Sequence, residues 1–315
     1  MSREDLINTT RAVLAKAGFD ISSALNLRSI CFDIVGRKDD TLIIVKVLSN
    51  VDAFSRDNAE DMKVLADALK ATPLLIGETS SSGPLEAGIV YSRFKIPIIS
   101  NETLAEHLLE EVPPFIFAAP GGLYVRIDSN MLKEVRESKS ISLGTLAETA
   151  GVSRRTIQMY ESGMGAMIDA AMRLEEFLQA PIIESINPFE YKSEKKPEEY
   201  EVTGGKRTES NALNRMLDIG FAITPVIKSP FEAITRSRQT IILTGLGTDE
   251  EKLIQKALIA SEISKIAGNH SLVIVERKRS AENIDSTAVV TSEELEKIDD
   301  QDALTDLVLS RSTKK

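Results

Sequence analysis

One stretch near the middle of the chain constrains the fold more than any other. Its apolar residues recur at helical spacing in four short segments: 131–137, 141–150, 154–161 and 168–178. Gly151 ends the second segment because glycine readily adopts a left-handed conformation, and Ser153 caps the third. A small residue, Ala147, lets two helices cross closely. An apolar set supplies the core: Leu143, Leu146, Val152 and Ile157. The pattern predicts an all-α domain of four to five helices.

The order of residues in this stretch resembles the Cro/C1-type (XRE) helix-turn-helix. The resemblance is carried by Leu132-Lys-Glu-Val-Arg136, Leu146-Ala147, Gly151-Val-Ser153, Thr156-Ile157 and Tyr160-Glu161-Ser-Gly163. It implies that helix 154–161 is a recognition helix that lies in the major groove of double-stranded DNA. The alternative is a helix-turn-helix that makes only protein contacts.

Polar residues at the start of this helix are the candidates for base contacts. They are Ser153, Arg154, Arg155, Thr156 and Gln158. Arginine can bridge O6 and N7 of guanine, and glutamine N6 and N7 of adenine. Neighbouring helical residues diverge by about 100°, so one of the two adjacent arginines points away from the bases. Three further cations are candidates for phosphate contacts: Lys133, Arg136 and Lys139.

Two stretches divide the chain of 315 residues. Residues 111–122 hold three prolines and two adjacent glycines, so they cannot continue a helix and indicate a connector. Residues 191–209 are charged and nearly devoid of apolar periodicity, as expected of an exposed linker. We therefore predict an α/β domain at 1–120, the helix-turn-helix domain at 121–190, a linker at 191–209 and a second α/β domain at 210–315.

Both flanking regions alternate helices with apolar strands. In the first, helices are expected at 4–17, 56–69 and 101–109, and strands at 29–35, 41–48, 73–77 and 91–100. Near-continuous apolar strands favour a sheet covered on both faces. The last region follows the same order, and Arg215–Ile223 echoes Val13–Ile21 through a shared Gly-Phe-x-Ile. We interpret the two domains as a duplication. The alternative is that two unrelated α/β domains have similar strand sequences by chance.

The first region also resembles the restriction-endonuclease-like fold of archaeal Holliday-junction resolvases. In that family, carboxylates on two strands hold Mg²⁺ and a lysine assists the attack of water on phosphate. Asp33 and Lys46 match two of these roles, but Ile44 stands where the second acid belongs. A second ligand would have to come from Asp57 or Glu60 on the next helix.

The second copy departs further from the nuclease pattern. Glu232 replaces Asp33, whereas Leu243 and Gly245 replace the second acid and the lysine. We therefore expect both α/β domains to be non-catalytic scaffolds, with no enzyme activity, no cofactor and no metal. The alternative is a DNA-processing nuclease that the helix-turn-helix targets and that uses Asp33 and Lys46 with Mg²⁺.

Composition limits the remaining classes. The net charge of −10 opposes a uniformly basic nucleic-acid coat but allows one local binding surface. A single cysteine, Cys31, permits no disulfide framework and is expected in the core. His107 is expected on a solvated helix face and His270 in a turn. No apolar run is long enough for a transmembrane helix, which favours a cytoplasmic protein.

The whole arrangement is similar to that of archaeal HTH-type transcriptional regulators of methanogens and their relatives. This resemblance implies sequence-specific DNA binding that controls transcription. Because helix-turn-helix proteins usually read paired half-sites as dimers, we expect a homodimer formed through the flanking domains. A third possibility is that the duplicated domains sense a metabolite, although no residue pattern names an effector ligand.

Overall fold

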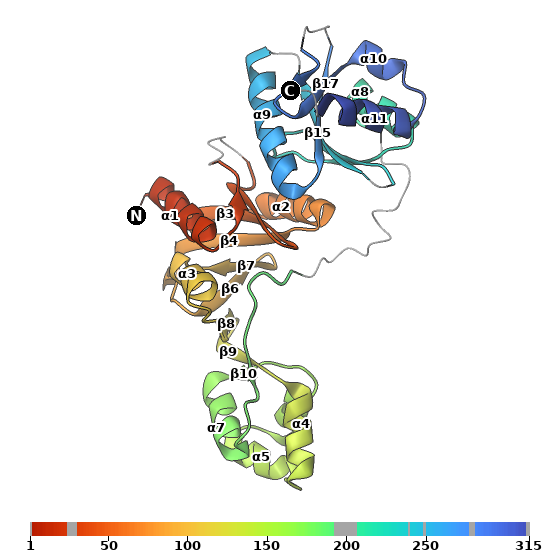
Figure 1. Ribbon diagram of the computed structural model, residues 1–315. Helices are drawn as coiled ribbons and strands as arrows, with labels where there is room; N and C mark the ends of the chain where they lie inside the picture. Colours follow the sequence, from red (N-terminus) through yellow and green to blue (C-terminus); the bar gives the residue numbers. More distant parts are fainter. Residues whose placement is uncertain are drawn as a thin grey trace. The chain divides into compact units, whose positions relative to one another are not determined.

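The computed structural model describes residues 2–23, 30–191, 207–238, 240–247, 250–276 and 281–312 (Figure 1). The chain separates into two compact units. The first unit holds residues 1–47, 53–73 and 191–315, and the second holds 48–52 and 74–190. The division crosses strand β3 (Thr41–Asn50), so the first α/β domain contributes to both units. Most of the linker expected at 191–209 lies outside the described residues.

The beginning of the first unit is a helix followed by an antiparallel ladder. Its elements are α1 (Arg3–Lys16), β1 (Asp20–Ile21), β2 (Ile34–Lys38), β3 and α2 (Arg56–Leu69). Ser2 begins α1 with a capping box, in which its hydroxyl and the Asp5 carboxylate each bond the other residue's backbone amide. The strand expected at 29–35 is shifted along the chain, because β2 begins at Ile34 and continues to Lys38, and Asp39 and Asp40 turn the chain into β3.

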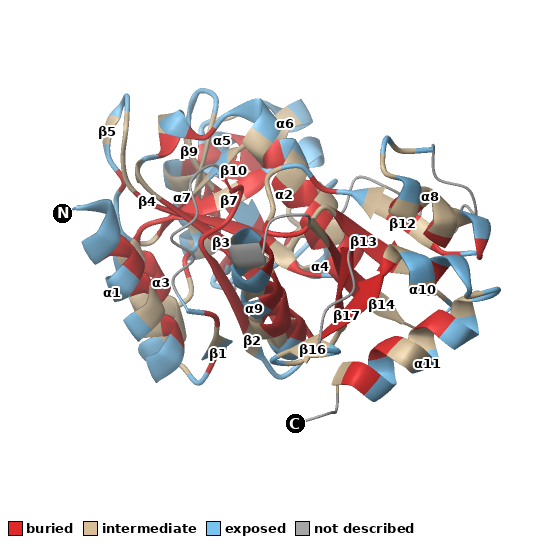
Figure 2. Cartoon of the chain, turned by 90° about the horizontal axis from the view of Figure 1, so that it is seen from above, coloured by how far each residue is buried: buried red, intermediate tan, exposed pale blue. Residues whose placement is uncertain are grey.

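The rest of the first unit is a six-stranded sheet with helices. The strand order is β12 (Ala222–Pro225), β13 (Ala233–Arg236), β14 (Ile241–Gly247), β15 (His270–Val275), β17 (Thr287–Thr291) and β16 (Asn283–Ile284). Its helices are α8 (Asn211–Asp218), α9 (Glu250–Ala267), α10 (Ser292–Glu296) and α11 (Gln301–Ser312). The central pairs β14–β15 and β15–β17 are parallel, and these strands are mostly buried (Figure 2). This agrees with the apolar runs in their sequence.

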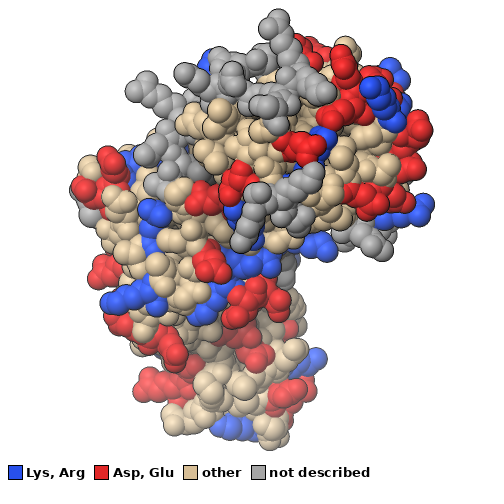
Figure 3. All heavy atoms as spheres, turned by 45° about the horizontal axis from the view of Figure 1, so that its top comes forward, with Lys and Arg blue, Asp and Glu red and all other residues tan. Residues whose placement is uncertain are grey.

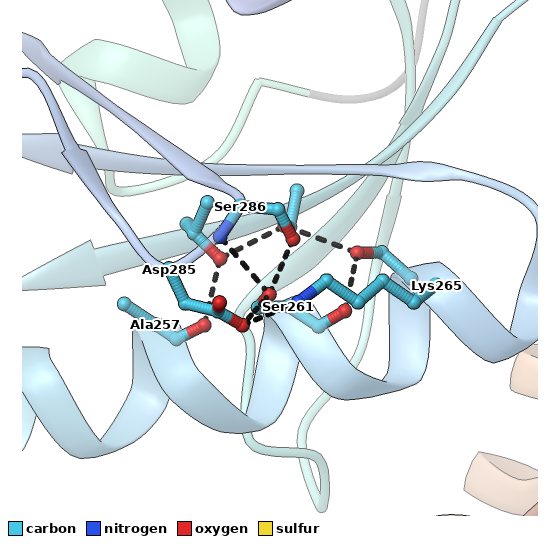
Figure 4. A network of polar contacts seen from close by, with 8 residues as sticks. Ala257, Ser261, Lys265, Asp285 and Ser286 are labelled. Atoms are coloured by element: carbon cyan, nitrogen blue, oxygen red, sulfur yellow. Dashed lines mark hydrogen bonds and ion pairs between the residues drawn. The ribbon is translucent and has the colours of Figure 1, made fainter. Parts of the chain in front are cut away.

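Buried hydroxyls join α9 to the sheet of this domain (Figure 4). Ser261 Oγ donates to Asp285 Oδ2 at 2.6 Å, and Lys265 Nζ donates to the same carboxylate oxygen at 2.6 Å. Thr287 Oγ1 donates to the Ala257 carbonyl at 2.7 Å. Since each buried hydroxyl has a partner, the polar groups fix the position of the helix at little desolvation cost.

The second unit contains a mixed sheet. Its strands are β4 (Thr72–Ser80), β5 (Gly83–Pro84), β6 (Ile89–Arg93), β7 (Ile96–Ile99), β8 (Ile116–Ala119) and β9 (Gly122–Ile127). The 3₁₀ turn η1 (Val51–Ala53) and helix α3 (Asn101–Leu109) complete the α/β part, and Ser100 caps α3. Strand β7 pairs with both β4 and β6.

Two predictions for this unit were wrong. The single strand expected at 91–100 is a hairpin of β6 and β7, because Phe94 and Lys95 both adopt positive φ, 51° and 67°. Two consecutive left-handed residues reverse the chain tightly. The connector expected at 111–122 contains β8, which pairs with β9 despite the flanking prolines.

Residues 128–186 of this unit form the small helical domain. Its helices are α4 (Ser129–Ser138), α5 (Leu143–Ala150), α6 (Arg154–Tyr160) and α7 (Ile168–Leu178), with the short strands β10 (Ala166–Met167) and β11 (Ile183–Glu184). Both short strands pair with β9. The core contains Leu132, Leu146, Ala147, Ile157 and Leu174, and Leu143 and Val152 pack against it. The four helical segments expected from sequence are therefore confirmed.

Two features are absent from the part of the chain that the structure describes. None of its helices is both long and apolar enough to cross a membrane. No three or more His, Cys, Asp and Glu side chains come together there as a possible metal-binding group.

Candidate nucleic-acid interface

The turn between α5 and α6 forms for local reasons. Ser142 and Ser153 precede the two helices, and their hydroxyls accept the backbone amides of Thr145 and Thr156, each at 3.1 Å. Gly151 adopts φ 70° and ends α5. These interactions involve residues only a few positions apart, so they fix the start of α6 through the sequence itself.

Helix α6 is anchored on one side and exposed on the other. Ile157 and Tyr160 are buried, and the Tyr160 carbonyl accepts the Ser129 hydroxyl at 2.6 Å. Arg154, Arg155 and Gln158 are exposed, and the cap Ser153 is exposed with them. The arrangement presents hydrogen-bonding side chains on a rigid helix, as base reading in a groove requires.

The two adjacent arginines point in different directions. A Cβ atom added to Gly144 would lie 3.0 Å from Nε and Nη2 of Arg154, so this guanidinium lies against the start of α5. Neither Arg154 nor Arg155 forms a side-chain hydrogen bond or ion pair within the described residues. Gly144 therefore leaves room for the Arg154 guanidinium beside α5, whereas Arg155 starts about 100° further around the helix and is exposed.

The three cations expected to contact phosphates differ in their surroundings. Lys133 is exposed on α4. Arg136 Nε donates to Glu161 Oε1 at 2.5 Å and its Nη2 donates to Oε2 at 3.2 Å, and these hydrogen bonds raise the pKa of Arg136. Lys139 donates to the Leu178 carbonyl at the end of α7. Arg136 and Lys139 are thus engaged in hydrogen bonds inside the domain, whereas Lys133 is exposed.

Two exposed residues at this surface were missed in the sequence analysis. Met159 follows Arg155 by four positions on α6, so both lie on one face, and 43% of Met159 is exposed. The signal available in the sequence was its position four residues after Arg155, on the helix face expected to contact bases. Arg173 of α7 reaches the turn, since Nη1 lies 3.1 Å from a Cβ added to Gly151. No local spacing connects Arg173 with this turn.

Charge over the molecule is mixed. On the face drawn in Figure 3, Lys and Arg side chains are interspersed with Asp and Glu rather than gathered into one continuous basic surface. This agrees with the net charge of −10. This face therefore offers only small groups of cations for phosphate contacts, with no continuous basic surface.

Asp33, which stands at the place of the first nuclease carboxylate, accepts hydrogen bonds on both of its oxygens. Asp33 Oδ1 accepts from Arg3 Nη2 at 2.6 Å and from Lys46 Nζ at 3.3 Å, and Oδ2 accepts from the Val47 amide at 2.8 Å. Burial lowers the pKa of Lys46, although the nearby Asp33 charge opposes this shift. One carboxylate between two cations is a poor donor set for Mg²⁺, which prefers several oxygen ligands.

The carboxylate of the second α/β domain has parallel contacts. Glu232 Oε2 accepts from the Leu246 amide at 2.6 Å, and Oε1 accepts from Lys256 of α9. Its own amide donates to the Thr244 carbonyl, as the Asp33 amide donates to that of Val45. Here too the acid is paired with a cation, and Leu243 is buried where a second acid would stand.

Comparison with known proteins found matches for both the nuclease-like region and the helix-turn-helix region. The sequence model of the PD-(D/E)XK superfamily domain matches residues 3–114, and that of the helix-turn-helix family matches residues 132–184. An HTH-type transcriptional regulatory protein from Methanocella arvoryzae is 41% identical, with 100% of this chain and 98% of the relative covered. The chain belongs to this family. The two resemblances predicted for the first and middle regions are thereby confirmed.

Other members of the family are similar over the same length. The relative from Methanosarcina mazei is 37% identical, with 99% of this chain and 98% of the relative covered, and that from Natronomonas pharaonis is 34% identical, with 99% of each covered. Both names describe HTH-type transcriptional regulatory proteins. No solved structure matches the chain significantly.

The surroundings of the two histidines and the cysteine can also be compared with the expectations from sequence. His107 is not a solvated helix residue as expected, because it is half-buried and its ring centroid lies 5.5 Å from that of Phe189. His270 begins β15 instead of lying in a turn. Cys31 is buried as expected, and this burial raises the pKa of its thiol to about 12, so the thiol is unreactive at neutral pH.

Proposed function

We propose that the protein is a sequence-specific transcriptional regulator that reads double-stranded DNA with α6 in the major groove. One observation carries the proposal: at the start of α6 stand exposed arginines that have no ion-pair partner among the residues that the structure describes, on a helix that Ile157 and Tyr160 anchor in the core. The match to the helix-turn-helix family and the names of the relatives support it.

Each exposed residue has a chemical role in this proposal. Arg155 and Gln158 reach base edges, and Met159 contacts a thymine methyl group from the same side of the helix. Arg154, which lies along the start of α5, contacts the neighbouring phosphate, as does Lys133. Ser153 and Thr156 position the helix, since their hydroxyls lie 2.9 Å apart at the cap.

The protein acts as a homodimer in this proposal, because each chain carries one recognition helix and operators commonly offer two half-sites. It works in the cytoplasm and uses no cofactor.

The first α/β domain is non-catalytic in the same proposal. The contacts of Asp33 with Arg3, Lys46 and Val47 support this role, as does Ile44 at the place of the second acid. Purified protein with Mg²⁺ or Mn²⁺ is expected not to cleave duplex, branched or single-stranded DNA above background. Metal-dependent cleavage that disappears in Asp33→Ala and Lys46→Ala would establish the nuclease alternative instead.

Selection of genomic fragments by the purified protein, followed by sequencing, tests the proposed function. We expect a small set of enriched fragments that share a motif with two related half-sites. An Arg155→Ala variant should lose enrichment at defined base positions of each half-site, whereas the matched Lys133→Ala variant should weaken all fragments evenly. Enrichment without any common motif would contradict sequence-specific reading, and no binding to any fragment would favour a helix-turn-helix that contacts only protein.

A further inference from the structure

Two arginines occupy the same place in the two α/β domains. The β1–β2 ladder pairs Asp20 with Arg37, and the β12–β13 ladder pairs Ala222 with Arg236. On the other side, Arg37 pairs with Leu42 of β3, and Arg236 pairs with Ile241 of β14. Arg37 and Arg236 are therefore equivalent by strand register on both sides.

Each of these arginines bonds the other α/β domain. Arg37 Nη2 donates to the carbonyl of Ala267, the last residue of α9, at 3.0 Å. Arg236 Nη2 donates to the carbonyl of Ala68, in the last turn of α2, at 2.7 Å. Helices α2 and α9 follow equivalent strands, β3 and β14, in their own domains. A cation at a helix C-terminus satisfies a carbonyl that has no helical partner and complements the helix dipole.

Each arginine thus bonds the last turn of the other domain's equivalent helix, although the two acceptors differ by one position, since Ala267 is the last residue of α9 and Ala68 the last but one of α2. Such reciprocal contacts are expected of a pseudo-two-fold interface, in which equivalent surfaces contact each other. We infer that the two α/β domains are paired with each other within one chain, as a fused two-fold dimer. The second domain is then the built-in partner of the first and occupies the face that a second copy of the chain would otherwise use.

Further contacts hold the same face together. The Cys31 amide donates to the Lys228 carbonyl at 2.9 Å, and Lys228 Nζ donates to Asn58 Oδ1 at 2.6 Å. Ser23 Oγ donates to Glu262 Oε2 of α9 at 2.6 Å. The first domain therefore contributes its strands, its loop before β2 and its helix α2 to this pairing.

One consequence concerns the homodimer and rests on the proposed function. Two chains that bind paired half-sites must associate through a surface other than this one. The pairing within the chain is independent of DNA, so its test uses none.

Cross-linking of mixed isotopes distinguishes pairing within a chain from pairing between chains. Lys38 follows Arg37 and Lys265 precedes Ala267 by two residues, and both amines are exposed. Light and ¹⁵N-labelled full-length chains are denatured together, refolded and treated with an amine-reactive cross-linker. We expect Lys38–Lys265 peptides only as light–light and heavy–heavy pairs. Mixed light–heavy pairs, or no such peptide in any form, would overturn the inference.

Hydrogen exchange tests the reciprocity itself. We expect Arg37→Ala to raise amide exchange about tenfold in the last turn of α9, and Arg236→Ala to do the same in the last turn of α2. Arg215→Ala is the matched control, since Arg215 donates to the Ile298 carbonyl inside the second domain, and its effect should stay in that domain. Increases confined to the domain that carries each substitution would contradict the fused dimer.

Discussion

The same cationic residue types serve opposite purposes in two regions of the molecule. In the first unit, Arg3 and Lys46 both form ion pairs with the buried carboxylate of Asp33. On α6, Arg154 and Arg155 are exposed and unpaired within the described residues. A resemblance to a catalytic or binding motif is therefore informative only when the partners of its charged residues are known. A cation paired inside a domain stabilises it, and an unpaired cation on a rigid element can bind a ligand.

The largest expected effect comes from Asp33. Replacement by alanine leaves Lys46 buried without its carboxylate, so Asp33→Ala should lower the free energy of unfolding by about 3 kcal/mol. Denaturant titration measures the change, and exposed Asp40 provides the control, with an expected effect within about 0.5 kcal/mol. Unchanged stability in Asp33→Ala would show that this carboxylate is not a structural partner.

Arg136 and Lys133 provide a paired and an exposed cation on the same helix, α4. Arg136→Gln leaves Glu161, which is largely buried, without its partner and should cost about 1–3 kcal/mol of unfolding free energy. Lys133→Gln should leave stability unchanged and lower the slope of log K against log salt for DNA by about 0.9 per chain. A salt slope that changes in Arg136→Gln but not in Lys133→Gln would contradict the assignment of Arg136 as a structural cation and Lys133 as a phosphate contact.

A third ion pair lies in the second α/β domain. Glu294 accepts from Arg311 Nη2 at 2.7 Å and caps α10, and the hydrogen bond from Arg311 lowers the pKa of Glu294 to about 2. Because the folded pKa lies below the ordinary value of 4.5, the pair stabilises the fold above that pH and loses its contribution as pH falls towards 2.

The corresponding variant is Glu294→Gln. With 41% of the Glu294 side chain exposed, solvent screening reduces the expected loss at pH 7 to about 1–2 kcal/mol. The stability difference between wild type and variant should shrink as pH falls from 4.5 to 2. A difference that stays constant over this range would contradict the assigned ion pair.

The helical domain was predictable from sequence because its determinants are local. Ser153, Gly151 and the buried Ile157 act within a few positions of the chain, so four helices could be placed from spacing alone. The hairpin at Phe94 and Lys95 was not predictable in this way, since neither residue is a common choice for the left-handed conformation.

The ion-pair and hydrogen-bond partners of the charged residues could not be predicted from the sequence. Arg136 and Glu161 are 25 positions apart, and no spacing rule connects them. The reciprocal contacts of Arg37 and Arg236 join positions more than 160 residues apart. Such pairs depend on the packed fold, whereas the location of most strands along the chain follows from the apolar pattern.

The triple variant Arg154→Ala, Arg155→Ala, Gln158→Ala tests whether α6 reads bases. The measurement is the ratio of affinity for the selected site to affinity for unrelated DNA at fixed salt. All three side chains are exposed, so the midpoint of unfolding should not change. Because each bidentate base contact contributes roughly 1–3 kcal/mol of discrimination, the ratio should fall to near one. A triple variant that keeps the wild-type ratio would contradict the assignment of α6 as the recognition helix.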